Sequence, residues 1–308
     1  MTDYSVLFRE LAVPRLVGTP NHQKVREVLK RELAARGFAA LEHRFFRRPS
    51  NAFWGFHAPI DGVNLIAQRP TGRPTPSLRS GQAVRPSIWL VAHYDSKGQP
   101  ISMFTRLLCV VTVLVALLTL WVSAILTDSS RWAFLFFVVV VAASWVLNRV
   151  NDNSPGAVDN ATALIAVFMT LDQLPPTAAV GVIFPDAEEY GLVGARALAA
   201  EHADLFVDAA LINLDGLDDV GRPTAFLHRP GPIATAVAEA LKARQWRWLP
   251  VIVDGIALKR VSRECVSILK GNWRTMRVVH RPEDTAARVR LDGAAIVAAG
   301  LARVLRPQ

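Results

Sequence analysis

The stretch "TAAVGVIFPDAEEYGLVGARALAAEHADLF", residues 177–206, joins an apolar run to a helix-like run through two adjacent glutamates, Glu188 and Glu189. An almost continuous apolar run of this length predicts a strand buried on both faces, as in a parallel sheet. Neighbouring carboxylates repel each other, and the end of a buried strand is a costly place to leave both uncompensated. The stretch therefore predicts an α/β fold. It also indicates that a positive charge lies close to the pair of glutamates.

Strand-like and helix-like runs alternate along most of the chain. Near-continuous apolar strands that alternate with helices predict a largely parallel central sheet covered by helices on both faces. In such a sheet, ligands bind beyond the carboxyl ends of the strands. Strands are predicted at 63–68, 87–95, 177–186, 209–216, 248–255 and 274–280, and helices at 21–38, 160–174, 191–206, 232–244 and 291–305.

The composition argues against a nucleic-acid-binding protein and against a disulfide-rich one. The chain has 308 residues, of which 51% are hydrophobic and 20% are charged, and its formal net charge is +9. We expect no nucleic-acid partner, because no block of Lys and Arg is interleaved with aromatic residues. Cys109 lies in an apolar run and Cys265 is the only other cysteine, so no disulfide framework is expected. Residues 69–86, rich in Pro, Gly, Ser and Arg, are predicted to form a flexible loop insertion.

The apolar excess is concentrated between residues 101 and 150. Residues 107–126 contain no charged side chain and are long enough to cross a bilayer as a helix. A second span is predicted at about 132–150, where Asn148 and Arg149 extend a shorter apolar run. We therefore expect a transmembrane helical hairpin at 101–150, inserted into one catalytic domain formed by 1–100 and 151–308. A helical hairpin buried in a soluble core is the alternative.

Charges beside the two spans predict their orientation. Arg106 and Arg149 lie outside the hairpin turn, whereas Arg131 lies within it. The positive-inside rule then favours a cytoplasmic catalytic domain. The N-terminal residues also lack the basic and apolar regions of a signal peptide. We expect an integral protein of a bacterial inner membrane, with the lipid bilayer as a partner.

Polar residues collect where the predicted strands end. Each has an ordinary structural explanation, because Asp often caps a helix, His often forms a structural hydrogen bond, and Glu complements the helix dipole. Together, two histidines and three carboxylates form a plausible ligand set for two zinc ions, with one further carboxylate free to move a proton. One glutamate of the pair would then bind metal while its neighbour handles the proton. The candidates are His93, Asp95, Asp159, Glu188, Glu189, Asp215 and His280.

Five short motifs, in this order, resemble a known family. They are "HYD" (93–95), "GAVDN" (156–160), "EEYGLVG" (188–194), "INLD" (212–215) and "HRPEDT" (280–285). Their succession is similar to that of the two-zinc exopeptidases, metallopeptidase family twenty-eight, which includes bacterial leucyl aminopeptidase, aminopeptidase Y and glutamate carboxypeptidase II. The resemblance covers nearly the whole chain except 69–86 and 103–150. It implies the zinc-exopeptidase, phosphorylase/hydrolase-like fold.

The resemblance also implies a role for each candidate. His93 and Asp215 would bind one zinc ion, Glu189 and His280 would bind the other, and Asp159 would bridge them. Co²⁺ and Mn²⁺ are also compatible with such ligands.

Two catalytic residues are implied as well. Asp95 would orient His93, and Glu188 would be the general base. The peptide bond between Asp159 and Asn160 would be cis.

The resemblance implies a zinc-dependent aminopeptidase that removes N-terminal residues from peptides with a free N-terminus, and the predicted hairpin makes it a membrane-anchored one. The alternatives are a glutaminyl-cyclase-like enzyme or an amidohydrolase on the same fold, and a non-catalytic receptor or scaffold. Residues 254–275, with Asp254 and Glu264, have no clear counterpart in the family. The substrate preference, the oxyanion-stabilising residue and the oligomeric state are therefore not predicted.

Overall fold

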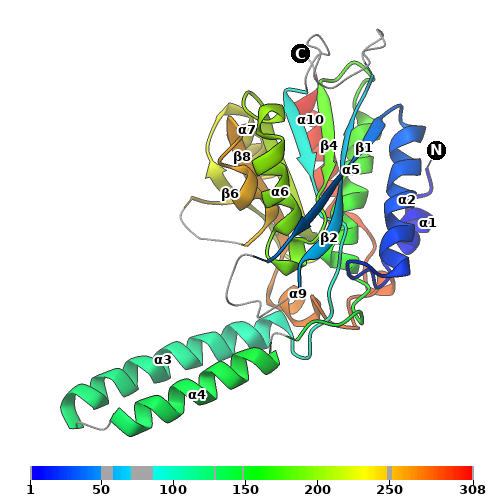
Figure 1. Cartoon of the computed structure of the whole chain (residues 1–308). Coiled ribbons are helices and arrows are strands. Elements are labelled where there is room, and N and C mark those ends of the chain that lie inside the picture. The colour runs from blue at the N-terminus through cyan, green and yellow to red at the C-terminus, as the bar shows by residue number, and fades with distance from the viewer. Residues whose placement is uncertain are drawn as a thin grey trace.

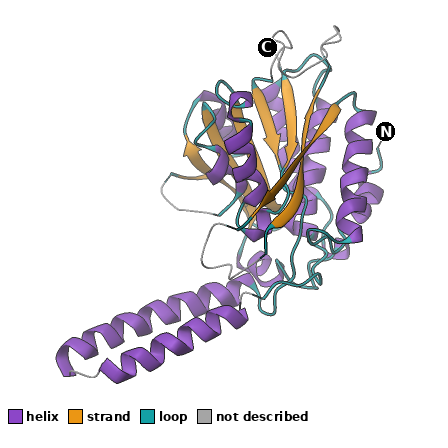
Figure 2. Cartoon of the chain, in the orientation of Figure 1, coloured by secondary structure: helices purple, strands orange, loops and turns teal. Residues whose placement is uncertain are grey.

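An eight-stranded mixed sheet forms the centre of the described part of the chain. The structure is a computed structural model, and it describes residues 2–49, 58–70, 86–127, 130–147, 149–247 and 252–306. The strand order is β1-β2-β4-β3-β5-β8-β6-β7, and helices cover both faces (Figures 1 and 2). The strands are β1 (Ala39–Arg47), β2 (Ile60–Gln68), β3 (Ile88–Val91), β4 (Val180–Phe184), β5 (Ala210–Leu217), β6 (Arg222–Arg229), β7 (Arg244–Trp246) and β8 (Glu264–Gly271).

The predicted parallel sheet is confirmed in its centre. β4, β3, β5 and β8 are parallel neighbours, so their carboxyl ends meet at one edge. The outer pairs β1–β2, β2–β4 and β6–β8 are antiparallel, and β6–β7 is parallel. Every residue of β4 is buried, as expected for a strand covered on both faces.

Alternate side chains of the central strands feed two separate cores. In β3, Leu90 joins one core, whereas Trp89 and Val91 join the other. This period of two is the geometry of a strand between two helical layers. The larger core also receives α1 (Tyr4–Leu11), α2 (Pro20–Ala35), α5 (Thr162–Gln173), α7 (Pro232–Ala240) and α10 (Asp292–Leu305), and the smaller core receives α6 (Val193–Glu201) and α8 (Asp254–Leu258).

Two predicted strands near the C-terminal end are wrong. Residues 274–280 were predicted as a strand, but α9 (Trp273–Val278) is a helix, because Asn272 and Thr275 form a capping box at its start. The strand predicted at 248–255 is also wrong where it is described, since Asp254 begins α8. Residues 248–251 lie outside the described residues, as do 71–85 of the predicted flexible loop. The strands β1, β6, β7 and β8 were not predicted from the sequence.

The predicted apolar hairpin forms two helices, α3 (Met103–Thr127) and α4 (Ser130–Leu147). They lie side by side and project from the body at the end where β3 leads out of the sheet (Figure 1). Met103–Ser123 has a mean hydropathy of 2.3, and none of its most apolar window is buried. By length and composition, α3 is therefore able to cross a bilayer, and the body does not cover it.

Candidate metal centre and active site

The strand ends deliver most of the candidate residues to one edge. His93 follows β3 by two residues, Asp215 lies near the end of β5, and Glu188 and Glu189 begin the short helical turn η3 (Glu188–Tyr190) after β4. Because β3, β4 and β5 are parallel neighbours, their ends converge. Asp159 comes from the irregular turn η2 (Ala157–Ala161), which leads into α5.

His280 approaches this edge in a different way from the prediction. It follows the helix α9 rather than a strand, and its backbone has a positive φ of 64°. The cis peptide bond predicted between Asp159 and Asn160 is present.

The five predicted metal ligands form two groups that share Asp159. His93, Asp159 and Asp215 make one triad, and Asp159, Glu189 and His280 make the other. Within each triad the potential ligand atoms all lie within 4.8 Å of one another. The structure thus brings together residues that are up to 187 positions apart in the chain, from His93 to His280.

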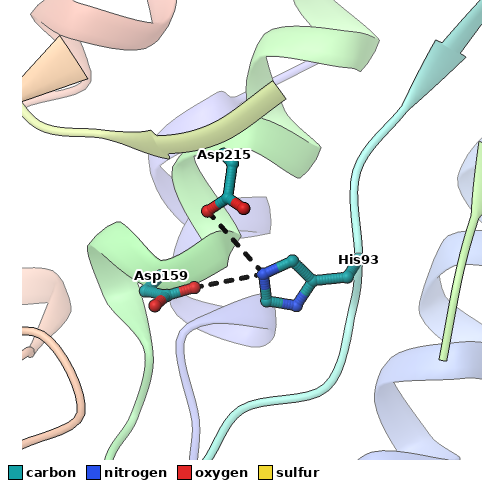
Figure 3. Close-up of side chains that lie close together, drawn as sticks. All are labelled: His93, Asp159 and Asp215. Atoms are coloured by element: carbon teal, nitrogen blue, oxygen red, sulfur yellow. Dashed lines mark ion pairs between the residues drawn. The ribbon is translucent and has the colours of Figure 1, made fainter. Parts of the chain in front are cut away.

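Asp159 offers one carboxylate oxygen to each triad. Its Oδ1 lies 3.1 Å from Nε2 of His93, and its Oδ2 lies 3.1 Å from Nε2 of His280. Nε2 of His280 is also 3.2 Å from Oε1 of Glu189. Nε2 of His93 is 3.9 Å from Oδ1 of Asp215 (Figure 3). This arrangement allows a single carboxylate to bridge two cations.

Asp95 stands behind the first triad. Its Oδ1 lies 3.3 Å from Nδ1 of His93, on the side of the ring opposite to Nε2. The same carboxylate accepts hydrogen bonds from the backbone N–H groups of Glu188 and Glu189, at 3.1 and 3.2 Å. Asp95 therefore fixes both the histidine ring and the turn that carries the two glutamates.

Gln99 holds the other histidine, and sequence reasoning did not find it. Its Oε1 lies 2.9 Å from Nδ1 of His280, and its backbone N–H donates to the His280 carbonyl at 2.8 Å. When Nδ1 of His280 donates to Gln99, Nε2 is left with its lone pair facing Asp159 and Glu189. The same Gln99 oxygen accepts a hydrogen bond from Arg106 in α3. A glutamine in a loop carries no sequence signal of such a role.

Lys97 is a second functional candidate that the sequence did not reveal. Its Nζ lies 2.8 Å from Oε2 of Glu189, and both side chains are 3% exposed. Burial alone would raise the pKa of Glu189, but the charges of His280 and Lys97 outweigh it and lower that pKa to about 2. Glu189 is thus held as an anion within the second triad.

For Glu188 and Asp254, burial outweighs the nearby positive charge, so the pKa is raised rather than lowered. Burial raises the pKa of Glu188 well above its usual value, with His93 opposing the rise and Glu189 adding to it. Burial also raises the pKa of Asp254 to about 8, against the attraction of His93 and with the help of Asp95. Neither carboxylate oxygen of Asp254 forms a hydrogen bond in the described part of the chain. Asp254 therefore belongs to this cluster, although no motif placed it there.

The residues present fit two divalent cations by their atoms. Among the buried polar atoms that form no hydrogen bond in the described chain are Nε2 of His93, Oδ1 of Asp159 and Oε1 of Glu189. All three belong to the triads, and buried polar atoms normally have a partner. Imidazole nitrogen and carboxylate oxygen are common ligands of zinc.

The residues also fit two divalent cations by their charge. Six buried carboxyl groups gather here against two buried cations, so four negative charges remain if all are ionised. Asp284 lies behind Asp159 and accepts hydrogen bonds from the backbone N–H groups of Val158 and Asp159, while Arg288, 3.9 Å away, pairs more closely with Asp218. Divalent cations would offset this excess and would favour the ionised forms of Glu188 and Asp254, whose pKa values are raised by burial. The two basic side chains are Arg15 and Lys97, and the six carboxyl groups are those of Asp95, Asp159, Glu188, Glu189, Asp215 and Asp254.

Comparison with known proteins identifies the family. The family model described as "Peptidase family M28" matches residues 77–304. The chain belongs to peptidase family M28. The predicted family is confirmed, and the predicted fold class is that of this family. No curated protein matches the sequence of the chain.

Solved structures share the fold at low sequence identity. A glutaminyl cyclase of Porphyromonas gingivalis has a TM-score of 0.64 and 16% identity, covering 98% of this chain and 96% of that chain. BSAP, a zinc aminopeptidase from Bacillus subtilis, has a TM-score of 0.64 and 11% identity, covering 98% and 94%. The aminopeptidase LapA of Legionella pneumophila has a TM-score of 0.59 and 12% identity, covering 98% and 71%. At these identities the likeness shows the fold alone.

The contact between Gln99 and His280 leads to a prediction about metal affinity. Gln99→Leu removes the acceptor for Nδ1 of His280, so the ring is no longer held with Nε2 facing the second triad. Because loss of such a supporting partner typically costs about 10–100-fold in metal affinity, we expect a weakening of that order. Zinc titration against a competing chelator measures it. Gln173→Leu, on the exposed end of α5, is the matched control. Unchanged zinc affinity in Gln99→Leu would remove this role.

Proposed function

We propose that this M28 peptidase is a membrane-anchored, zinc-dependent aminopeptidase. The observation that carries the proposal is the pair of triads that share Asp159, with one oxygen of that carboxylate directed to each histidine. A single cation would need only one triad. The shared carboxylate and the excess of buried negative charge support a site for two.

Each of the two triads would bind one zinc ion. His93 and Asp215 would hold one zinc ion, Glu189 and His280 the other, and Asp159 would bridge them. Co²⁺ and Mn²⁺ suit the same atoms. When bound, the two metal ions would lower the pKa of a shared water and polarise the scissile carbonyl group.

Glu188 is the proposed general base. It lies in the cluster but in neither triad, and burial raises its pKa, which makes the carboxylate a stronger proton acceptor. In peptide hydrolysis, Glu188 takes one proton from the attacking water. It then delivers that proton to the leaving amine when the C–N bond breaks. Asp95 keeps the backbone of Glu188 in place through its hydrogen bond.

The charge of the cluster also supports the choice of substrate. A free α-amino group is a cation at neutral pH, and it suits an edge lined with buried carboxylates. The proposed substrate is therefore a peptide with a free N-terminus.

A glutaminyl cyclase is the second candidate, and one observation favours it. The triad of Asp159, Glu189 and His280 is tighter, with distances of 3.1 and 3.2 Å, whereas Asp215 lies 3.9 Å from His93. A single metal ion in the tighter triad would suit a one-zinc enzyme. The metal content therefore separates the two candidates.

Membrane anchoring is the second part of the proposal. It is supported by the length and apolar composition of α3 and by the exposed apolar side chains along it, such as Leu114 and Leu118. α4 packs beside α3, so the pair would enter and leave the bilayer on the same side. The charges at the ends of the hairpin favour a cytoplasmic body at a bacterial inner membrane.

Metal analysis tests the two-ion site. We expect two zinc ions per chain in the purified protein. Asp159→Ala should lose both, because it serves both triads, whereas Asp215→Ala should lose one. Asp208→Ala, an exposed aspartate, is the matched control and should keep two. One zinc ion in the unaltered protein would favour the cyclase, and none under zinc-replete conditions would favour a non-catalytic scaffold.

Replacement of the proposed base tests the mechanism. Glu188→Gln should lower the rate of aminoacyl-anilide hydrolysis by roughly 10²–10⁴-fold, because the proton acceptor is lost. The zinc content should remain unchanged, since Glu188 belongs to neither triad. Glu239→Gln, an exposed glutamate of α7, should leave the rate unchanged.

Substrates with different N-termini complete this test. A free N-terminus should be required, so an acetylated peptide should not react. Chelation should stop turnover and zinc should restore it. Cyclisation of an N-terminal glutamine without release of any amino acid would overturn the aminopeptidase in favour of the cyclase. Full activity of Glu188→Gln would remove the assignment of the base.

Extraction and labelling test the anchor. The chain should stay with membranes at alkaline pH, because two apolar helices hold it. A cysteine placed at Ser129, between α3 and α4, should react with an impermeant reagent in intact cells if the body is cytoplasmic. Labelling only after the cells are permeabilised would reverse the orientation. Release into the alkaline supernatant would contradict anchoring.

A further inference from the structure

A basic and aromatic face lies where the hairpin leaves the body. We call it the root face, and it consists of Phe104, Trp273, Arg274, Arg277 and Arg281. α9 carries three of these residues and lies against the first turns of α3 (Figure 1). The Arg277 guanidinium stands 5.5 Å from the centre of the Phe104 ring and 4.9 Å from that of Trp273.

Two of the three arginines of the root face are turned outward, whereas Arg281 lies 3.6 Å from Glu283 and donates to the Gln99 carbonyl. Arg274 and Arg277 are three positions apart in α9, so they share one side of the helix. Both are exposed, and neither forms an ion pair in the described part of the chain. The Trp273 ring lies against both guanidinium groups, at 5.5 Å from that of Arg274 and 4.9 Å from that of Arg277, and the residue is 50% exposed. Arginine next to tryptophan is the composition typical of the membrane–water interface.

An ordinary solvated surface is the simpler explanation of exposed arginines, but the position of this face argues against it. The exposed apolar side chains of α3 begin at Leu107 and Leu108, one turn after Phe104. A bilayer that holds α3 therefore brings its headgroups to the level of Phe104. Because α9 packs beside that turn, Arg274 and Arg277 meet the same headgroups.

We propose that the root face docks on anionic lipid headgroups and holds the catalytic edge at the membrane surface. The inference rests on the proposed membrane anchoring. It also deepens the proposed function, since the substrates it selects are peptide N-termini that lie at the bilayer surface rather than free in solution.

The root face and the metal centre form one connected piece. His280, a proposed ligand, follows α9 by two residues. Arg281 of the root face donates to the carbonyl of Gln99 at 3.0 Å, and the Gln99 side chain contacts His280 at 2.9 Å. Docking of the root face therefore fixes the orientation of the metal centre relative to the bilayer.

Quenching of Trp273 in lipid nanodiscs tests the docking. The full chain is placed in discs of phosphatidylcholine alone or mixed with phosphatidylglycerol, each containing a headgroup-level spin-label quencher. The Trp273 signal is the difference between the unaltered chain and Trp273→Phe. We expect stronger quenching in the anionic discs, with the gain lost at high salt because headgroup charges are then screened.

Charge variants decide whether the arginines are responsible. Arg274→Glu with Arg277→Glu should abolish the gain in quenching, since each arginine near an anionic surface strengthens association roughly fivefold. The milder pair Arg274→Gln with Arg277→Gln should lower it part of the way. Arg303→Glu with Arg306→Glu is the matched control, at the C-terminal end of the chain away from the hairpin (Figure 1).

The outcomes separate this inference from the proposal on which it rests. Quenching that is equal in neutral and anionic discs, or unchanged by the Arg274 and Arg277 variants, would overturn the docking while the chain remains in the discs. A chain that does not enter the discs would overturn anchoring as well. In the anionic discs, a peptide attached to lipid should be hydrolysed faster than the same peptide in solution, and this preference should fall in the Arg274→Glu, Arg277→Glu variant.

Discussion

The concentration of negative charge around Asp159 is the constraint on which the site depends. Ionised carboxylates are costly to bury unless opposite charge lies close to them. Here Asp159 is 8% exposed and meets two histidines through its two oxygens, while Lys97 and Arg15 are the buried cations nearby. The remaining negative charge needs a partner from outside the chain. Divalent cations are suited to supply that partner.

Buried hydrogen bonds convert this charge cluster into a defined geometry. Asp95 and Gln99 hold the two histidine rings from behind, so that both Nε2 atoms turn toward Asp159. Arg15, which is fully buried, donates to the carbonyls of Tyr94 and Gly156 and thereby ties the segment after β3 to the turn before Asp159. The histidine of each triad is therefore supported by a different residue of the segment that follows β3, and its orientation does not depend on the metal alone.

The sequence predicted the parts of the molecule that depend on local pattern and on motif order. Continuous apolar runs revealed three of the four central parallel strands, namely β3, β4 and β5, and the charge-free run at 107–126 revealed the projecting hairpin. The seven candidate residues also come together at one edge. The sequence failed where tertiary contacts decide. Lys97 and Gln99 become functional candidates only through contacts with Glu189 and His280, far away in the chain. The capping box of Asn272 and Thr275 overrode the strand-like run that ends at His280.

The place of the hairpin within the chain has a consequence for biogenesis. β3 and the His93 that follows it leave the ribosome before α3, yet both sheet neighbours of β3, which are β4 and β5, are made after α4. The N-terminal segment can pair β1 with β2 during synthesis, but β3 stays unpaired until the hairpin has been made. If the hairpin enters the bilayer as it emerges, maturation of the enzyme follows delivery to the membrane. A chain that missed its translocation machinery would expose both an apolar hairpin and an unfinished sheet, which marks it for quality control.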